Sequence, residues 1–134
     1  MKVIPTPLRL IGALWCCVLV SVHARAEDYA EWTYFMNCTL NTTSSGADIT
    51  TGNDVPDFPV LVRLTADNFV FSELSYTDGR DLRFAAEDGS HLYYEIERCD
   101  GGTADSAEIW VRMDTVKVNN STQFFTMYWG KSGA

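Results

Sequence analysis

The stretch DGRDLRFAAEDGSHLYYEIE, residues 78–97, decides the fold, because two alternating segments flank an Asp-Gly turn signal. Leu82 and Phe84 share one face of the first segment, and Tyr94 and Ile96 share one face of the second. Directly opposed residues of an antiparallel pair point to the same side of the sheet. Burial of all four side chains therefore predicts a hairpin with the pairs 82–96 and 84–94 and a loop of three or five residues.

The carboxylates of this stretch have an ordinary place in such a hairpin. Arg83 is expected opposite Glu95, and Glu95 and Glu97 share the solvated face of the return strand. The other acids fall in turns or at strand ends, where their side chains accept hydrogen bonds from nearby backbone groups.

The rest of the chain after residue 26 also indicates strands. The strand-like segments are 31–40, 58–64, 81–85, 91–98, 107–113 and 122–129, and the Thr-, Ser- and Gly-rich segment 41–54 is expected to be a long loop. Segment 68–74 fits either a short helix or a bent strand. Short strands with turn signals at close spacing predict an all-β fold, an antiparallel β-sandwich of the jelly-roll or immunoglobulin-like kind.

The first 26 residues read as a secretory signal peptide. Lys2 and Arg9 form a positive start, 10–22 is an uncharged apolar run, and Ala24-Arg25-Ala26 fits a cleavage site. An uncleaved membrane anchor is the alternative, but the apolar run is shorter than the ~20 residues that span a bilayer. The expected domains are a signal peptide, 1–26, and a single β-sandwich domain, 27–134, secreted, periplasmic or at the cell surface.

The charge of the expected mature chain limits its partners. Three of the ten basic residues lie in 1–26, so residues 27–134 carry seven basic and 18 acidic residues, a net charge near −11. A surface this acidic repels nucleic acid and anionic lipid. It is compatible with calcium, with neutral polymers or with solubility alone.

Two cysteines remain in the expected mature chain, Cys38 and Cys99. An even number in an exported protein predicts that they pair, closing a loop of about 60 residues and contributing roughly 4 kcal/mol. Two free thiols are the alternative.

Several separated blocks occur in an order typical of one family. They are Trp32-x-Tyr34, DFPVLVRL (57–64), NFVFS (68–72), DGRDLRF (78–84), YYEIE (93–97), IWV (109–111) and MYWG (127–130). Together they resemble the bacterial exported domain of unknown function 2341, across about residues 30 to 134. The chain departs from that pattern at LYY (92–94), VRMD (111–114) and GK (130–131).

The resemblance implies a domain of secreted or surface proteins. Such domains often precede a concanavalin A-like lectin domain or immunoglobulin-like modules, and some lie near biopolymer-transport components. No catalytic or ligand residues are established in the family, so the resemblance assigns none here. The chain ends at Ala134, where a second module normally begins, which leaves open a stand-alone copy or a truncated multidomain protein.

Two acidic groups are candidate sites. The carboxylates of Asp78, Asp81, Glu87 and Asp88 could supply oxygens to calcium, although their spacing does not fit an EF-hand loop and turn chemistry explains them without a cofactor. Glu95 and Glu97 could resemble a glycosidase pair, but such pairs usually come from different strands across a cleft. With His91 the single histidine after residue 26, a carbohydrate-active enzyme is the weaker alternative to a non-enzymatic protein.

Aromatic residues form the other candidate site. Trp110 alternates with Glu108 and Arg112, and Tyr93 alternates with Glu95. Trp110, Tyr93, Glu95 and Arg112 are therefore the candidate ligand-binding residues, as a partner-facing platform. Burial is favoured for Trp110 because Trp is usually well covered, and it is favoured more strongly for Trp32 and Trp129.

Four Asn residues begin Asn-x-Ser/Thr sequons that matter only in a glycosylating host: Asn37, Asn41, Asn119 and Asn120.

The expected function is an exported, non-enzymatic module that binds a glycan, a surface polymer or a surface protein. The alternative is a purely structural spacer or assembly module of an envelope or surface complex.

Overall fold

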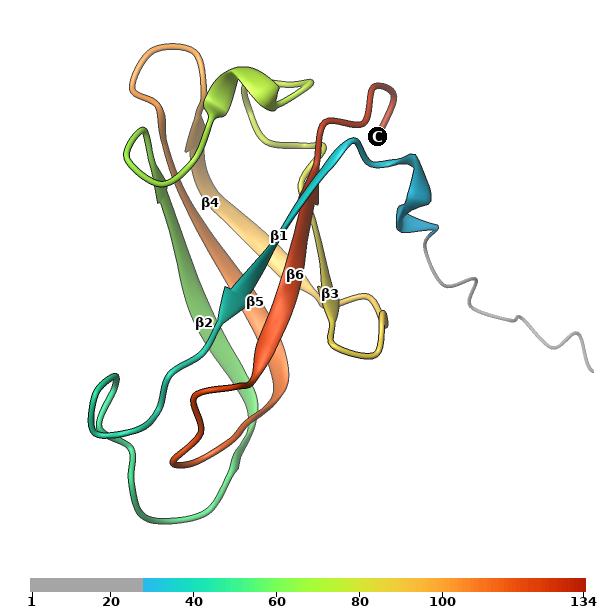
Figure 1. The fold of residues 1–134 in the computed structure, drawn as a ribbon. Helices are drawn as coiled ribbons and strands as arrows, with labels where there is room; N and C mark the ends of the chain where they lie inside the picture. Colours follow the sequence, from blue (N-terminus) through green and yellow to red (C-terminus); the bar gives the residue numbers. More distant parts are fainter. Residues whose placement is uncertain (1–27) are drawn as a thin grey trace, which may run out of the picture.

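The computed structural model describes residues 28–134, which form two facing antiparallel sheets (Figure 1). The expected signal peptide, residues 1–26, lies outside the described residues. One sheet has the order β1-β6-β3, with β1 at Tyr34–Thr39, β6 at Phe124–Trp129 and β3 at Arg83–Ala86. The other has the order β2-β5-β4, with β2 at Val55–Thr65, β5 at Ser106–Val116 and β4 at Tyr94–Asp100. The predicted antiparallel sandwich is confirmed.

The local predictions agree with this arrangement. Segments 58–64 and 107–113 lie inside the two long strands β2 and β5, and 41–54 is a loop with turns. The ambiguous segment 68–74 contains a short 3-10 helix, η2 (Phe71–Glu73), and another, η1 (Tyr29–Glu31), precedes β1. Pro56 and Pro59 are tolerated in β2 because it is an edge strand, where one side needs no donor.

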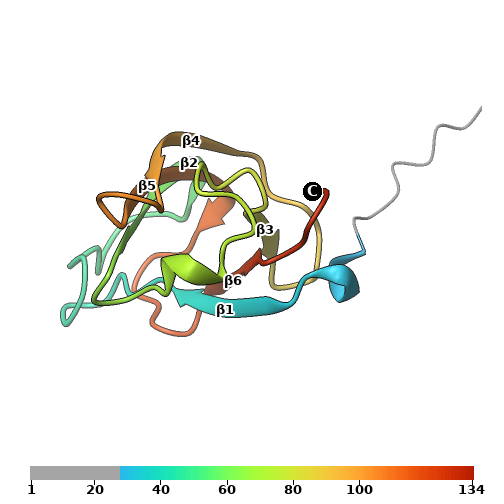
Figure 2. The same ribbon diagram turned by 90° about the horizontal axis from the view of Figure 1, so that it is seen from above.

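The core lies between the two sheets, which appear as separate layers in Figure 2. Period-two alternation turns one face of each strand inward. The side chains that are almost completely buried come from both layers: Leu82, Phe84, Ile109, Val111, Phe125 and Met127. Trp32 and Trp129, at 7% and 6% exposed, are buried as predicted.

The predicted pairing of β3 with β4 is wrong. β3 pairs with β6 in one sheet, and β4 pairs with β5 in the other. A short bridge joins the two segments before the chain crosses to the other layer: Ala85 pairs with His91, the Ala86 N–H donates to the Ser90 carbonyl, and the Leu92 N–H donates to the Phe84 carbonyl. The inward faces were predicted correctly, because Leu82 and Phe84 are buried and Tyr94 and Ile96 pack on the same core from the opposite sheet.

The predicted disulfide is also wrong, because Cys38 and Cys99 are both free thiols. Cys38 lies on β1 opposite Phe125, whereas Cys99 lies on β4 opposite Ala107 in the other sheet. The strand of Cys99, β4, is connected to β3, and β3 lies at the opposite edge of its sheet from β1, the strand of Cys38. The fold therefore keeps the two cysteines apart. Burial raises the pKa of Cys38 to about 11.

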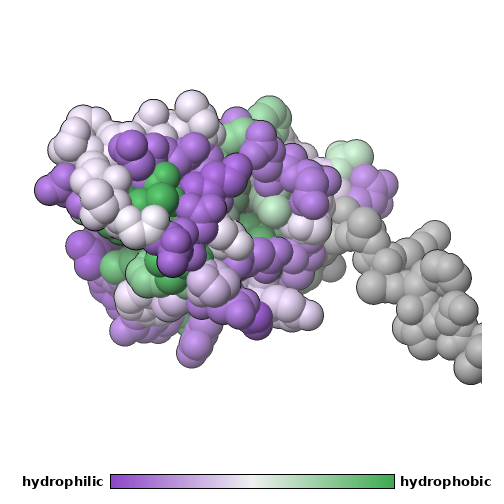
Figure 3. All heavy atoms as spheres, turned by 90° about the horizontal axis from the view of Figure 1, so that it is seen from below, coloured by the Kyte–Doolittle hydropathy of each residue, from purple (hydrophilic) through white to green (hydrophobic). Residues whose placement is uncertain are grey.

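The connections 40–54 and 117–123 lie together at one end of the sandwich (Figure 1), and apolar atoms show between polar ones when the molecule is seen from below (Figure 3). A hollow of about 270 Å³ lies between the layers, with Leu92, Met113 and Phe124 among its lining residues and Glu87 and Asp114 at its sides. Among residues 28–134, no helix has the length and apolar character needed to cross a membrane.

Candidate binding face

The four residues proposed as a platform lie together on the outer face of the sheet β2-β5-β4. Trp110 is directly opposite Glu95, and the Arg112 N–H donates to the Tyr93 carbonyl over 2.8 Å. Their neighbours in sequence, Tyr94 and Val111, pair on the core side. Alternation therefore turns all four side chains outward as a quadrangle on two adjacent strands. We call this quadrangle, Tyr93, Glu95, Trp110 and Arg112, the outer platform.

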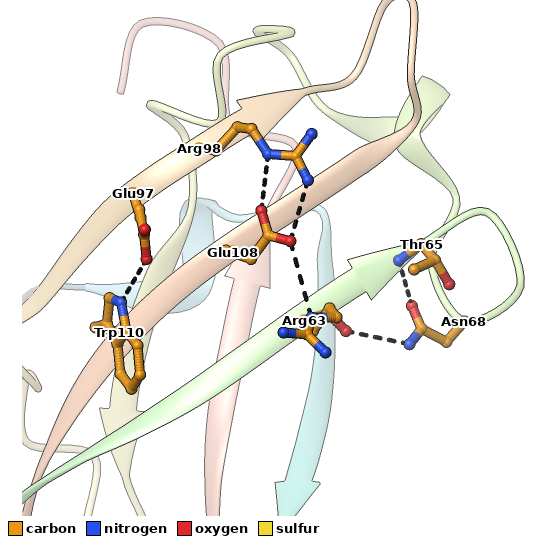
Figure 4. A network of polar contacts seen from close by, with 7 residues as sticks. All are labelled: Arg63, Thr65, Asn68, Glu97, Arg98, Glu108 and Trp110. Carbon is orange, nitrogen blue, oxygen red and sulfur yellow. Dashed lines mark hydrogen bonds and ion pairs between the residues drawn. The ribbon is translucent and has the colours of Figure 1, made fainter.

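Trp110 is the centre of this platform, and the prediction that it is buried is wrong. Its side chain is 38% exposed, and the indole Nε1 donates to Glu97 Oε2 over 2.7 Å (Figure 4). It lies on the central strand between Leu61 on β2 and Glu95 on β4. These neighbours cover its edges, but no third layer covers its ring within residues 28–134.

Tyr93 is the most exposed aromatic side chain of the platform, at 73%. It immediately precedes β4 and lies diagonally from Trp110, at the separation of roughly 7–8 Å that aromatic side chains can bridge. The His91 ring stands nearly perpendicular to it, with the ring centroids 6.3 Å apart. Two rings of different strands are thus open to one ligand.

Ion pairs surround the two rings. Arg112 Nε donates to Asp57 Oδ1 over 3.1 Å, and this carboxylate raises the pKa of the guanidinium. Glu108 accepts from Arg98 Nε at 2.8 Å and lies 3.8 Å from Arg63, and the Arg98 bond lowers the pKa of Glu108 (Figure 4). Exposed pairs like these add little stability, but they hold long side chains in place around the platform.

The carboxylate of Glu95 has no basic side chain paired with it among residues 28–134. The predicted Arg83–Glu95 pair is wrong, since Arg83 lies opposite Tyr128 in the other sheet. Within residues 28–134 the exposed Glu95 carboxylate has no recorded hydrogen bond or ion pair. Its oxygens are therefore available to accept from a ligand hydroxyl beside the Trp110 ring.

The four acids considered as calcium ligands do not meet. Asp78 pairs with Arg80, whose hydrogen bond lowers the pKa of the Asp78 carboxyl, and Asp88 accepts from the Ser90 N–H and hydroxyl. Asp81 precedes β3 and Glu87 follows it, so the strand separates them by roughly 20 Å. No group of three metal-ligating side chains occurs in the part of the chain that the structure describes.

Asp81 instead fastens three segments of the fold. Its buried Oδ2 accepts from the backbone N–H groups of Ser75, at 2.8 Å, and Gly130, at 2.9 Å. Its carbonyl accepts from Trp32 Nε1 at 2.9 Å. Gly130 has a φ of 84°, and a Cβ there would lie 2.6 Å from the Tyr34 ring, so this turn requires glycine.

Arg83 adds further hydrogen bonds beside those of Asp81. Its Nη1 donates to the Tyr94 hydroxyl and to the carbonyls of Arg80 and Leu82, and the Tyr94 hydroxyl donates to the Leu82 carbonyl over 2.7 Å. The guanidinium lies 5.6 Å from the Trp32 ring, and Lys131 lies 4.2 Å from it. We call Trp32, Asp81, Arg83, Tyr94 and Gly130 the motif joint. Sequence reasoning missed it, although its members come from the blocks WTY, DGRDLRF, YYEIE and MYWG.

Residues 78–134 match the family model described as "Domain of unknown function (DUF2341)". Residues 78–134 are thus similar to the DUF2341 family that the sequence blocks resemble. The matched part spans β3 to β6, and no match was found among curated proteins or among solved structures. Every residue of the outer platform, and every residue of the motif joint except Trp32, lies within the DUF2341 match.

A second group of aromatic rings, of which Phe35 is exposed, lies on the opposite sheet, outside the predicted site. Tyr29, Ala30, Trp32, Phe35 and Tyr128 line a hollow of about 370 Å³. Tyr29 stacks on Tyr128 with the ring centroids 4.3 Å apart, and Phe35 is 69% exposed. Phe35 falls on the polar face of an alternating strand, and this alternation alone could have marked it as an outward ring.

Proposed function

We propose that this chain is an exported, non-enzymatic module that binds a glycan through the outer platform. One observation supports this most strongly: Trp110 and Tyr93 are exposed together on one sheet face, with Glu95 and Arg112 between them. A sugar ring presents an apolar C–H face and a rim of hydroxyls. Exposed aromatic rings with polar groups beside them match both parts of that chemistry.

The charges around the platform narrow the ligand class. The chain after residue 26 has a net charge near −11, and Glu95 and Glu97 lie beside Trp110, so an anionic polymer is repelled. Arg112 already holds Asp57, which leaves few free cationic donors to bind phosphate or sulfate. We therefore propose a neutral glycan or surface polymer, with Glu95 accepting from its hydroxyls.

The platform supports binding better than catalysis. Glycosidases use two carboxyl groups that flank the scissile bond within a cleft. Glu97 is bonded to the Trp110 indole, and Glu95 stands on the same strand of an open face. Export is part of this proposal and follows from the signal-like residues 1–26.

Glycan-array and polysaccharide affinity-electrophoresis measurements on the chain, expressed from Met1 and purified, test the proposal. Trp110→Ala and Tyr93→Ala are expected to weaken retardation by a neutral polysaccharide at least ~10-fold each, because alanine removes the stacking surface. Phe35→Ala, which removes an exposed ring from the opposite sheet, is the matched control and should keep the parent's affinity for a short neutral oligosaccharide, which occupies one platform.

Two results would count against glycan binding. One is an array without signal in both the presence and the absence of calcium. The other is equal binding by the Trp110→Ala and Phe35→Ala proteins. Either result would favour the structural spacer, for which the motif joint is the supporting observation.

A further inference from the structure

The four sheet edges of the sandwich differ in how they are protected against pairing with another chain. An unprotected edge exposes backbone N–H and C=O groups, and proteins usually block it with proline, charge, a bulge or a very short strand. β2 contains Pro56 and Pro59, and Asp57 between them has a φ of 51°. β4 has a register shift between Ile96 and Arg98 and four charged residues, and β3 is only four residues long.

β1 has none of these devices. Its sequence, YFMNCT at 34–39, contains no proline and no charge, and its pairing with β6 runs without a register shift. It lies at the margin of its sheet, as Figures 1 and 2 show. Segment 66–70 approaches its inner side around a hollow lined by Met36 and Trp129, but makes no recorded backbone hydrogen bond to β1 within residues 28–134.

The register shows which backbone groups of β1 are open. The Leu40 N–H donates to the Gln123 carbonyl, which continues the β1–β6 register by one residue. Hydrogen-bonded and non-hydrogen-bonded pairs alternate along antiparallel strands, so the even-numbered residues of β1 bond to β6. The N–H and C=O groups of Phe35, Asn37 and Thr39 therefore point to the free edge.

We propose that this edge pairs with β1 of a second copy of the chain, antiparallel and two-fold symmetric about Asn37. Phe35 then lies opposite Thr39 of the second copy, Asn37 lies opposite its counterpart, and the three open N–H and C=O pairs are satisfied on both sides. The faces also match, since residues 35, 37 and 39 all lie on the outer face of their sheet.

Charge and symmetry favour a second copy as the occupant. β1 is uncharged, so two strongly acidic chains bring no like charges into direct opposition along this edge. A two-fold contact uses the same patch on both copies and consumes it. Because the other three edges are protected, pairing ends at a closed dimer and does not continue into a fibre.

Sedimentation equilibrium on the chain, expressed from Met1 and purified, tests this proposal at rising chain concentration. The parent is expected to be a reversible dimer. Asn37→Pro removes the outward N–H at the centre of the interface and should give a monomer, whereas Asn37→Ala keeps that N–H and should remain dimeric. Circular dichroism shows whether each variant keeps its β-sheet content.

Charged variants test the register even if Asn37→Pro fails to fold. Asn37→Lys and Asn37→Asp should each be monomeric, because like charges meet at the axis, and an equimolar mixture should recover a dimer. A monomeric parent at every concentration would overturn the proposal and leave the edge for an extended segment of another protein. A parent dimer that survives in Asn37→Lys and Asn37→Asp would overturn it as well.

Discussion

Replacing Asp81 with alanine should destabilise this protein more than any change to its exposed acids. The substitution leaves the N–H groups of Ser75 and Gly130 without their acceptor in a site that is 0% exposed at Asp81. A buried donor left unpaired costs about 1–3 kcal/mol. The two donors together give an expected loss of about 3 kcal/mol, a large share of the stability of a small domain.

Equilibrium unfolding in urea, followed by tryptophan fluorescence, measures this loss. With a slope of about 1.5–2 kcal/mol per molar urea, the midpoint should fall by roughly 1.5–2 M. Trp32 is a suitable probe because its indole bonds to the Asp81 carbonyl. Asp81→Asn keeps one acceptor oxygen and should lose only about 1–2 kcal/mol.

Asp78→Ala is the matched control, since Asp78 belongs to the same DGRD turn but is exposed, and its side chain bonds to nearby Arg80. Its midpoint should stay close to that of the parent. Equal midpoints for the Asp81→Ala and Asp78→Ala proteins would refute the argument that Asp81 fastens the motif joint. A calcium-dependent midpoint that is lost in both variants would instead restore the metal site.

Three further predictions follow from particular contacts. Tyr94→Phe removes a half-buried hydroxyl that donates to the Leu82 carbonyl and should lower the free energy of unfolding by about 1 kcal/mol in the same urea assay. Burial raises the pKa of the Cys38 thiol from 9.0 to about 11, so its contribution to the free energy of unfolding is complete below pH 9 and is lost as the pH rises towards 11. Between pH 9 and pH 11 the free energy of unfolding of the parent should fall by about 2 kcal/mol more than that of Cys38→Ala. Arg98 lowers the pKa of Glu108, so the stability that this ion pair adds is present above pH 4.5, the ordinary pKa, and is lost as the pH falls through the lowered pKa. In an acid titration of stability, Glu108→Gln should not show this loss, and added salt should make the loss smaller in the parent.

Alternation in the sequence was enough to predict the strands and their inward faces. It placed 107–113 and 122–129 in strands and turned Leu82 and Phe84 into the core. It could not choose the partner of each strand, because a period of two fixes a face but not a neighbour. β3 and β4 bury the same side chains from opposite sheets as they would in one hairpin, so burial alone did not distinguish the two arrangements.

Alternation also predicted which residues form the outer platform, but it did not predict that the Trp110 ring is exposed. Trp110, Glu95, Tyr93 and Arg112 meet because outward positions on paired strands must be neighbours. The exposure of Trp110 depends on how much its neighbours Leu61 and Glu95 cover, which an average preference for burial does not describe.

Two other features depended on contacts distant in the sequence. Asp81 is buried because its acceptor meets N–H groups from residues 75 and 130, which only the folded chain brings together. The cysteine count likewise shows that a pair can form but not that Cys38 and Cys99 lie on different sheets.

The proposed dimer and the proposed glycan face have a joint consequence. When two β1 strands pair with their outer faces on the same side, the two-fold axis stands perpendicular to the extended sheet, and both outer platforms point in the same direction. A polymer long enough to reach both platforms then binds with avidity, whereas a short oligosaccharide occupies one. Asn37→Lys should therefore weaken polysaccharide binding while leaving the affinity for a short oligosaccharide unchanged, as measured by calorimetry. Loss of both affinities would mean that the substitution damages the platform itself, and loss of neither would mean that the two copies do not present their platforms together.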